Sequence, residues 1–197
     1  QPAEDPQPEP GSAHVGEAAP DFALMDLGGN GHQLSEYLAE GKIVVLEWFN
    51  PDCPLVVKHH ERFSTMTDTY AAFQPGENAE EDEESKVVWL AINSAREGNA
   101  TGDPDRNLER VEEWEIPYPI LLDPTGIVGK AYEARTTPHM FVIAEDGTLI
   151  YAGAIDNNDH PREAGDINYV MQAIEQHLAG ETLTDPETRA YGCGIKY

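Results

Sequence analysis

The sequence predicts one α/β domain with three layers (α/β/α), in which helices cover both faces of a mixed central sheet. Two apolar segments, 42–49 and 87–93, each precede a helical segment, and this alternation is typical of a parallel sheet core. The pair Asp146-Gly147 between two further apolar runs is a strong hairpin signal, which adds antiparallel strands at one side. A length of 197 residues suits a single domain with a substantial core.

The N-terminal part predicts a tether followed by a hairpin. Residues 1–14 are rich in Pro and acidic residues and cannot form a core, so we expect a disordered acidic tether there and a folded domain over 15–197. The segment 22–27 runs into a Gly-Gly-Asn-Gly turn at 28–31, which indicates an N-terminal hairpin extension. A brief helix is expected over 35–40.

The segment 42–49 (KIVVLEWF) is almost continuously apolar, which predicts a strand buried on both faces. A turn and a helix follow. Pro54 suits the first turn of this helix, because the N–H group that proline lacks would have no partner there. The helix is predicted to run on to residue 73, because apolar side chains recur every three or four residues. This stripe comprises Val56, His60, Phe63, Met66, Tyr70 and Phe73.

The acidic segment 74–86 indicates a surface loop. A second buried strand is expected at 87–93, a helix at 105–115 and a short strand at 120–122. Another helix should run from Asp123-Pro124 to about Tyr132.

A strand at 139–144 should pair across the Asp-Gly turn with 148–153. Asp166 is expected to cap a final helix that Gly180 ends. Residues 181–197 then form an irregular tail with the second cysteine.

The charge balance excludes two classes of partner. The chain has 37 acidic and 12 basic residues, a formal net charge of -25, and such a field repels nucleic acid and anionic membrane surfaces. The longest apolar runs are too short to span a bilayer. The acidic surface is best explained by solubility.

The chain begins at Gln1, and the Pro-rich segment follows directly. This start predicts an exported protein whose secretory leader has been removed. In an extracytoplasmic location, periplasmic or secreted and with 1–14 as a tether, the two cysteines would meet an oxidising environment.

Cys53 is the candidate nucleophile. It stands between a buried strand and a helix start, where unpaired backbone N–H groups and the helix dipole stabilise an anion. A thiol in such a place tends to have a lowered pKa and to react as the thiolate. Asp52 opposes this, because a neighbouring carboxylate disfavours a second negative charge. The alternative is an unreactive buried thiol.

Thr137-Pro138 is the second candidate element. An X-Pro bond before a buried strand can be cis, which exposes the backbone of the preceding residue for strand-like pairing with a substrate.

Together these segments carry a family resemblance. Phe49–Val56, VVWLAIN, YPILLD, TTPHMFVI, EDGTLIYAGAIDNN and the terminal GCGIKY resemble the peroxiredoxin-like branch of the redoxin (alkyl hydroperoxide reductase/thiol-specific antioxidant) superfamily, from about Val15 to Tyr197. The IDNN stretch and the Gly-Cys-x-Ile-Lys-aromatic ending are narrow markers of this branch. The resemblance implies a thioredoxin fold, Cys53 at the attacking position and Pro138 as a cis-proline facing it. No cofactor is expected.

The chain departs from both reactions that the resemblance suggests. Peroxiredoxins have Thr or Ser three residues before the attacking cysteine, where this chain has Asn50, and the basic residue nearest to the place of their distant Arg is Arg135. Thioredoxin-type enzymes use Cys-x-x-Cys, and here Val56 replaces the second cysteine. We therefore expect a thiol-based redox protein, either peroxiredoxin-like or a thiol–disulfide oxidoreductase. Its substrate would be a small peroxide or a protein disulfide and its reductant an unidentified thiol. A homodimer remains open.

Cys193 is the remaining partner for Cys53. It could resolve a catalytic intermediate, form a permanent disulfide that pins the tail, or pair between subunits, and the sequence leaves all three open.

A metal-binding or redox-inert module of the same fold is the alternative function. Cys53 with His59, His60 or His139 would suit Cu or Zn. Copper chaperones of this fold resemble Cys-x-x-x-Cys plus a distant His, and Val57 stands where their second cysteine would be. His60 lies on the apolar stripe, where a hydrogen-bonded core histidine is the usual explanation.

Overall fold

The computed structural model describes residues 9–76 and 84–197. Its strands are β1 (Ala23–Asp26), β2 (Gly31–Gln33), β3 (Ile43–Trp48), β4 (Val87–Asn93), β5 (Ile120–Leu122), β6 (Thr136–Thr137), β7 (Met140–Ile143), β8 (Leu149–Gly153) and β9 (Cys193–Gly194). Its helices are α1 (Leu34–Ala39), α2 (Pro54–Val57), the π-helical turn η1 (Lys58–Arg62), α3 (Thr65–Ala72), the 3-10 turn η2 (Ala100–Gly102), α4 (Pro104–Glu113), α5 (Ile127–Ala131) and α6 (Tyr169–Leu178).

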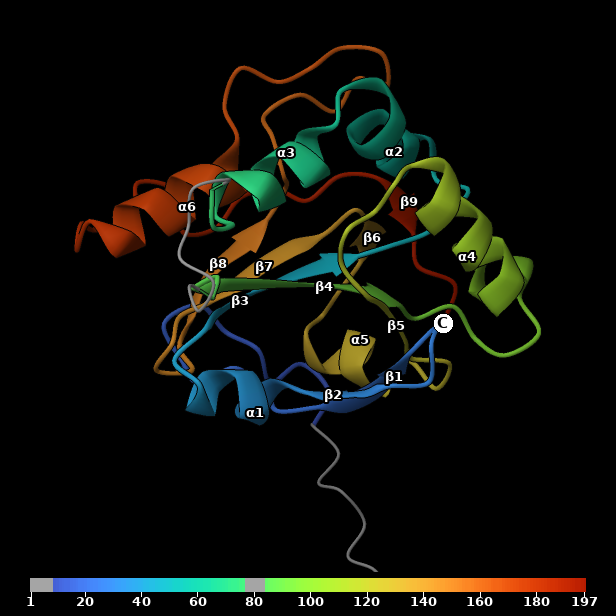
Figure 1. Ribbon diagram of the computed structural model, residues 1–197, viewed down its shortest axis with the longest axis horizontal. Helices are drawn as coiled ribbons and strands as arrows, with labels where there is room; N and C mark the ends of the chain where they lie inside the picture. Colours follow the sequence, from blue (N-terminus) through green and yellow to red (C-terminus); the bar gives the residue numbers. More distant parts are fainter. Residues whose placement is uncertain (1–8, 77–83) are drawn as a thin grey trace, which may run out of the picture.

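The predicted three-layer α/β/α architecture is confirmed (Figure 1). A seven-stranded sheet runs in the order β2-β1-β5-β4-β3-β7-β8. β4 is parallel to β3 and β5, whereas β7 is antiparallel to both β3 and β8, so the sheet is mixed. β1 and β2 form the expected N-terminal hairpin. Helices α2, α3, α4 and α6 cover one face, and α1 and α5 cover the other.

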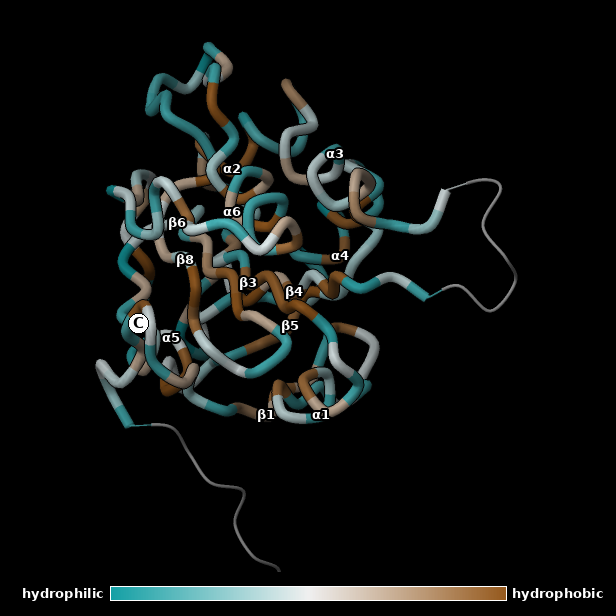
Figure 2. The backbone as a smooth tube through the Cα atoms, turned by 90° about the vertical axis from the view of Figure 1, so that its left-hand side faces the viewer, coloured by the Kyte–Doolittle hydropathy of each residue, from teal (hydrophilic) through white to brown (hydrophobic). Residues whose placement is uncertain are grey.

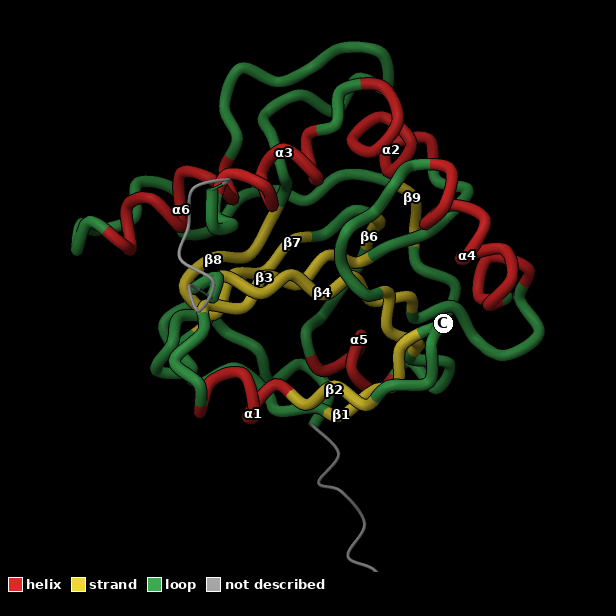
Figure 3. Tube along the Cα trace, in the orientation of Figure 1, coloured by secondary structure: helices red, strands yellow, loops and turns green. Residues whose placement is uncertain are grey.

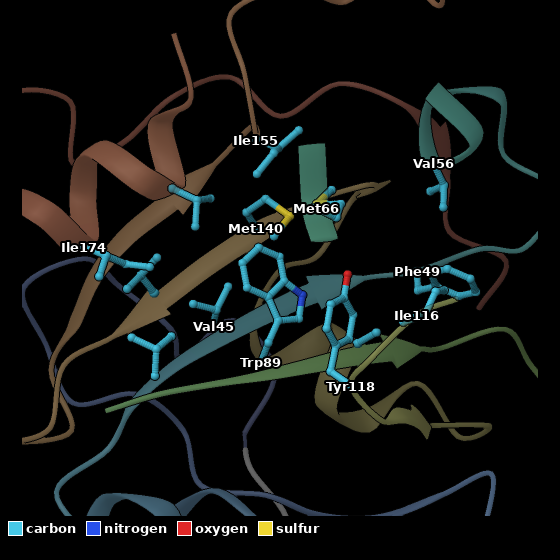
Figure 4. Packing of buried hydrophobic residues seen from close by; sticks show 14 of the residues in the cluster. Val45, Phe49, Val56, Met66, Trp89, Ile116, Tyr118, Met140, Ile155 and Ile174 are labelled. Carbon is cyan, nitrogen blue, oxygen red and sulfur yellow. The ribbon is translucent and has the colours of Figure 1, made fainter. Parts of the chain in front are cut away.

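Each face of the sheet has its own apolar core, because the side chains of a strand alternate between its two faces. In β3, Val45 packs with α2 and α6, whereas Leu46 and Trp48 pack with α1 and α5. Figure 4 shows the first of these cores around Trp89 and Tyr118. In Figure 2 the hydrophobic central strands lie inside a largely hydrophilic periphery. Burial on both faces explains why the sequence of β3 is almost continuously apolar.

The helix predicted from Pro54 to residue 73 is interrupted, and this prediction was wrong. It runs as α2 and η1, breaks at Ser64 in a left-handed conformation (φ 50°), and resumes as α3 (Figure 3). The wider π turn allows three consecutive side chains, Lys58, His59 and His60, to be buried, each with a polar partner. Phe63, assigned to the apolar stripe, is instead 36% exposed.

Two helix starts also differ from the prediction. α6 is capped by Asn168, whose side chain accepts a hydrogen bond from Met171 N at 3.0 Å. Asp166 lies two residues before this cap, in a loop where its backbone N–H donates to Asn157 Oδ1. α5 begins after Asp123, whose buried carboxylate accepts hydrogen bonds from Ser94 Oγ and Gly129 N instead.

The packed part of the chain begins inside the expected tether. Gly11 N donates to Lys130 O at 2.8 Å and Ala13 N to Ala131 O at 3.1 Å, so both residues lie against α5. Residues 1–8, and residues 77–83 of the expected acidic loop, lie outside the described residues. Over the described ranges, none of the helices has the length and apolar character that crossing a membrane requires.

Candidate active site

The sheet brings Cys53 close to Thr137-Pro138. β3 and β7 are antiparallel, with Glu47 opposite Met140, so the chain leaving β3 lies beside the chain entering β7. The hydrogen bond from Trp48 N to His139 O, at 2.9 Å, extends this pairing beyond the strand end. The Thr137-Pro138 peptide bond is cis, as the family resemblance implied.

The turn 50–53 delivers Cys53 to the start of α2. Asn50 Oδ1 accepts a hydrogen bond from Asp52 N at 2.9 Å, and Asn50 O accepts one from Cys53 N at 3.2 Å. Such side chain–backbone bonds are the usual reason for asparagine in tight turns. Pro54 is the first residue of α2, as predicted.

The sulfur atoms of Cys53 and Cys193 lie 2.6 Å apart, although 140 positions separate the two residues. Both are free thiols. Cys53 is 1% exposed, and its Sγ also donates to Thr137 O at 2.9 Å. The expected contact of Sγ with backbone N–H groups of the helix start is not among its hydrogen bonds in the described chain. The two thiols thus contact each other directly beside the cis-proline.

Cys193 reaches this position as part of a short added strand. β9 pairs antiparallel with β6, with Cys193 opposite Thr137. The chain is so close there that a Cβ on Gly192 (φ 142°) would lie 2.0 Å from Thr137 O. Glycine is therefore required immediately before Cys193.

Residues on both sides of Cys193 hold the tail. On one side, the Tyr191 hydroxyl donates to Asp156 and contacts His59 Nε2 at 3.0 Å. On the other, Tyr197 OH donates to Ala134 O at 2.7 Å, and Lys130 Nζ lies 5.6 Å from the centre of the Tyr197 ring. Cys193 is thus positioned from two directions.

A buried polar cluster links the tail to the helical segment that begins after Cys53. Lys58, 0% exposed, contacts Asp156 Oδ2 at 3.3 Å and donates to Asn158 O at 2.5 Å. Burial alone would raise the pKa of Asp156, but hydrogen bonds from Tyr191 and from backbone N–H groups, together with the charge of His59, hold it below its usual value. Asp156 and Asn158 belong to the IDNN stretch, which sequence reasoning singled out without a role.

Asp52 is paired with a cation that the sequence did not indicate. Arg106, on α4, donates to Asp52 Oδ1 through Nη2 at 2.5 Å and through Nε at 3.1 Å. The repulsion of a Cys53 thiolate by Asp52, expected from the sequence, is therefore partly offset. The contact spans 54 positions, so no local pattern could have revealed it.

Glu47 forms the second buried polar network on this face of the sheet. Its carboxyl group, 0% exposed, accepts hydrogen bonds from His60 Nε2 at 2.7 Å, Trp89 Nε1 at 3.0 Å and Tyr118 OH at 3.0 Å. His60 is therefore the hydrogen-bonded core histidine that its place on the apolar stripe indicated.

The four candidate metal ligands do not come together. His59 contacts Tyr191, His60 contacts Glu47, and the nitrogen Nδ1 of His139 accepts from Arg135 N at 3.4 Å. Over residues 9–76 and 84–197, no group of three or more His, Cys, Asp or Glu side chains could hold a metal ion. The arrangement around Cys53 suits sulfur chemistry with Cys193 instead.

Burial shifts the pKa of Cys193 and the pKa values of two histidines, His59 and His139, in opposite directions. For Cys193, burial and then the hydrogen bond and charge of Cys53 raise the pKa to about 12, against a smaller opposing effect of Lys196. For His59, burial lowers the pKa to about 4, Asp156 opposes this, and Lys58 adds to it. Burial also lowers the pKa of His139 to about 4.

We expect the free energy of unfolding to fall as the pH decreases from about 6.5 toward 4. His59 and His139 bind protons near pH 6.5 in the unfolded chain but only near pH 4 in the folded one, so acid favours unfolding in this window. Each histidine can contribute up to about 3 kcal/mol. Urea unfolding at pH 7.5, 6 and 5 measures this slope. The variant carrying both His59→Gln and His139→Gln should have a shallower slope, and an unchanged slope would contradict the assignment.

Comparison with known proteins places these features in a family. The Redoxin family pattern matches residues 14–171. The chain is 31% identical over 149 residues to the thiol-disulfide oxidoreductase ResA of Geobacillus thermodenitrificans, covering 74% of this chain and 73% of that protein. Among solved structures, it resembles a hypothetical protein of Sinorhizobium meliloti (27% identity, TM-score 0.73, 97% and 98% of the two chains). It also resembles an uncharacterized conserved protein of Geobacillus kaustophilus (26% identity, TM-score 0.75, 98% and 97%).

These matches confirm the predicted thioredoxin-like fold and, at the level of class, the expectation of a thiol-based redox protein. The family pattern covers about four fifths of the sequence and includes Cys53 and Thr137-Pro138, while Cys193 lies beyond it. The chain belongs to the redoxin family.

Proposed function

We propose that the protein is a thiol–disulfide oxidoreductase that alternates between a Cys53/Cys193 dithiol and the corresponding disulfide. The observation that carries this proposal is the distance of 2.6 Å between the two sulfur atoms. A small approach of the tail brings them within bonding distance. The name of the Geobacillus thermodenitrificans relative, a thiol-disulfide oxidoreductase, supports the same reaction.

In this proposal Cys193 supplies the second thiol of the redox pair, which a Cys-x-x-Cys motif would otherwise provide. Thr137-Pro138 shapes the site, because Thr137 O accepts the hydrogen bond from Cys53 Sγ and its strand holds Cys193. Protein disulfides and dithiols are the proposed substrate and reductant. The part of the chain from residue 15 onward acts as one redox domain, since its tail supplies one of the two thiols.

Peroxide reduction is the less favoured reaction. The residue three positions before Cys53 is Asn50, whose side-chain oxygen is bonded to Asp52 N, so it offers no hydroxyl to a peroxide. An antioxidant role would then depend on repair of disulfides rather than on removal of peroxide. An extracytoplasmic location fits a cycle through a disulfide, because disulfides persist in oxidising compartments.

The test has two parts. After treatment with oxidised glutathione, peptide mapping under non-reducing conditions should show a Cys53–Cys193 disulfide within one chain, and denaturing electrophoresis without reductant should show no covalent dimer. The protein should then catalyse reduction of insulin disulfides by dithiothreitol. A protein that forms no intramolecular disulfide and does not accelerate insulin reduction would contradict the proposal. Faster turnover of hydrogen peroxide than of insulin would favour the peroxidase reading.

A further inference from the structure

The C-terminal segment 186–197 crosses the redox site as an added strand. In Figure 1 the red chain passes from α6 beside β6 and α2, and Figure 3 shows β9 as its short extended part. β9 pairs with β6 so that Cys193 stands opposite Thr137, the residue before the cis-proline. An extended peptide that brought a cysteine to Cys53 would pair with the same backbone. The chain's own tail thus occupies the edge that such a peptide would need.

The two sulfur atoms differ in their access to solvent. Cys53 is 1% exposed and belongs to the apolar core with Phe49 and Val56. Cys193 is partly exposed, and the glycines on both sides of it, Gly192 and Gly194, are exposed. A thiolate attacks a disulfide in line with the bond that breaks. Attack on Cys193 therefore comes from the side opposite Cys53, whereas attack on Cys53 would have to come through the core.

We propose that external thiols and disulfides exchange with this protein at the sulfur of Cys193, and that Cys53 reacts only with Cys193. This inference rests on the proposed function, because it assigns the two steps of that cycle to particular atoms.

The reduction then proceeds in two balanced exchanges. An external thiolate forms a bond to Cys193 Sγ, the Cys53–Cys193 bond breaks, and its electron pair leaves on Cys53 as a thiolate. A second external thiolate attacks the external sulfur of this mixed disulfide and releases Cys193, which takes up a proton. Two thiols are oxidised to one disulfide, and the protein disulfide is reduced to the dithiol. The reverse sequence oxidises the protein with an external disulfide, and the mixed disulfide again stands on Cys193.

The direct test traps the mixed disulfide. The oxidised wild-type protein is mixed with reduced glutathione, quenched with acid after short times and alkylated, and its peptides are mapped by mass spectrometry. We expect glutathione on the Cys193 peptide and the alkyl group on Cys53, with at least about a tenfold excess over the opposite pattern. Glutathione on Cys53 would overturn the inference.

A pair of variants tests whether the tail is what shields Cys53. In Cys193→Ser, the tail keeps its other contacts, so Cys53 should react slowly with oxidised glutathione. Adding Gly192→Ala places a Cβ 2.0 Å from Thr137 O, which forces β9 away from β6. Cys53 should then react at least about tenfold faster in the double variant. Circular dichroism establishes that both variants are folded, and equal rates in two folded proteins would overturn the inference.

These outcomes separate the inference from the proposed function. A wild-type protein that never forms the intramolecular disulfide overturns both. A protein that forms the disulfide and reduces insulin, but collects glutathione on Cys53, overturns the inference alone.

Discussion

Cys53→Ser and Cys193→Ser should each reduce the catalysed rate of insulin reduction by dithiothreitol at least roughly 100-fold, because neither thiol alone can complete the disulfide cycle. The sulfur atoms lie 2.6 Å apart, and serine in either place removes the bond that the cycle makes and breaks. Since serine is close to cysteine in size, the fold should survive both substitutions.

The double variant Cys53→Ser/Cys193→Ser provides the matched control. It sets the uncatalysed background, and each single variant should lie near it. Thermal unfolding followed by circular dichroism shows whether the proteins remain folded. A Cys193→Ser protein with wild-type turnover would mean that Cys53 acts without its tail partner, which would contradict the two-thiol cycle.

Glu47→Leu should lower the free energy of unfolding by about 3–5 kcal/mol, the usual cost of removing one partner from a buried polar network. Leucine leaves the donors of three buried side chains, His60, Trp89 and Tyr118, without their acceptor. For a chain of this length, the melting temperature should fall by roughly 10 °C. Equilibrium unfolding in urea measures the loss.

Glu112→Leu is the control for Glu47→Leu. Glu112 lies exposed on α4, so the same substitution there should change the free energy of unfolding by less than about 0.5 kcal/mol. Glu47→Gln, which retains an acceptor oxygen, should lie between the two. A Glu47→Leu protein as stable as Glu112→Leu would show that the network contributes little.

The features that sequence reasoning predicted depend on local patterns. The apolar run of β3, the hairpin at Asp146-Gly147 and the placing of Pro54 follow from the periodicity and chemistry of neighbouring residues, and all three are found. The position of Cys53 at a strand–helix junction follows in the same way. The cis bond before Pro138 was expected from the family resemblance, and it is present.

The features that sequence reasoning missed depend on contacts between distant segments. The tail has no periodic pattern, so nothing local places Tyr191 against Asp156. The approach of Cys193 to Cys53 was one of the alternatives that the sequence left open, and the structure shows the two sulfur atoms in contact. The helix is interrupted after α2 because Lys58 and His59 form polar contacts in the interior. A pattern of apolar residues does not reveal such contacts. The IDNN stretch was the available signal, since its Asp156 meets both Lys58 and the tail.

The added strand β9 also has a consequence for the unfolded chain. A covalent bond between Cys53 and Cys193 would close a loop of 140 positions, which includes strands β4, β5, β7 and β8 of the main sheet and helices α2 to α6. Closing a loop of this size removes conformational entropy from the unfolded ensemble and stabilises the folded state by about 4–5 kcal/mol. The oxidised protein would then resist heat and proteolysis far better than the reduced one. Each redox cycle would therefore also change the stability of the folded protein.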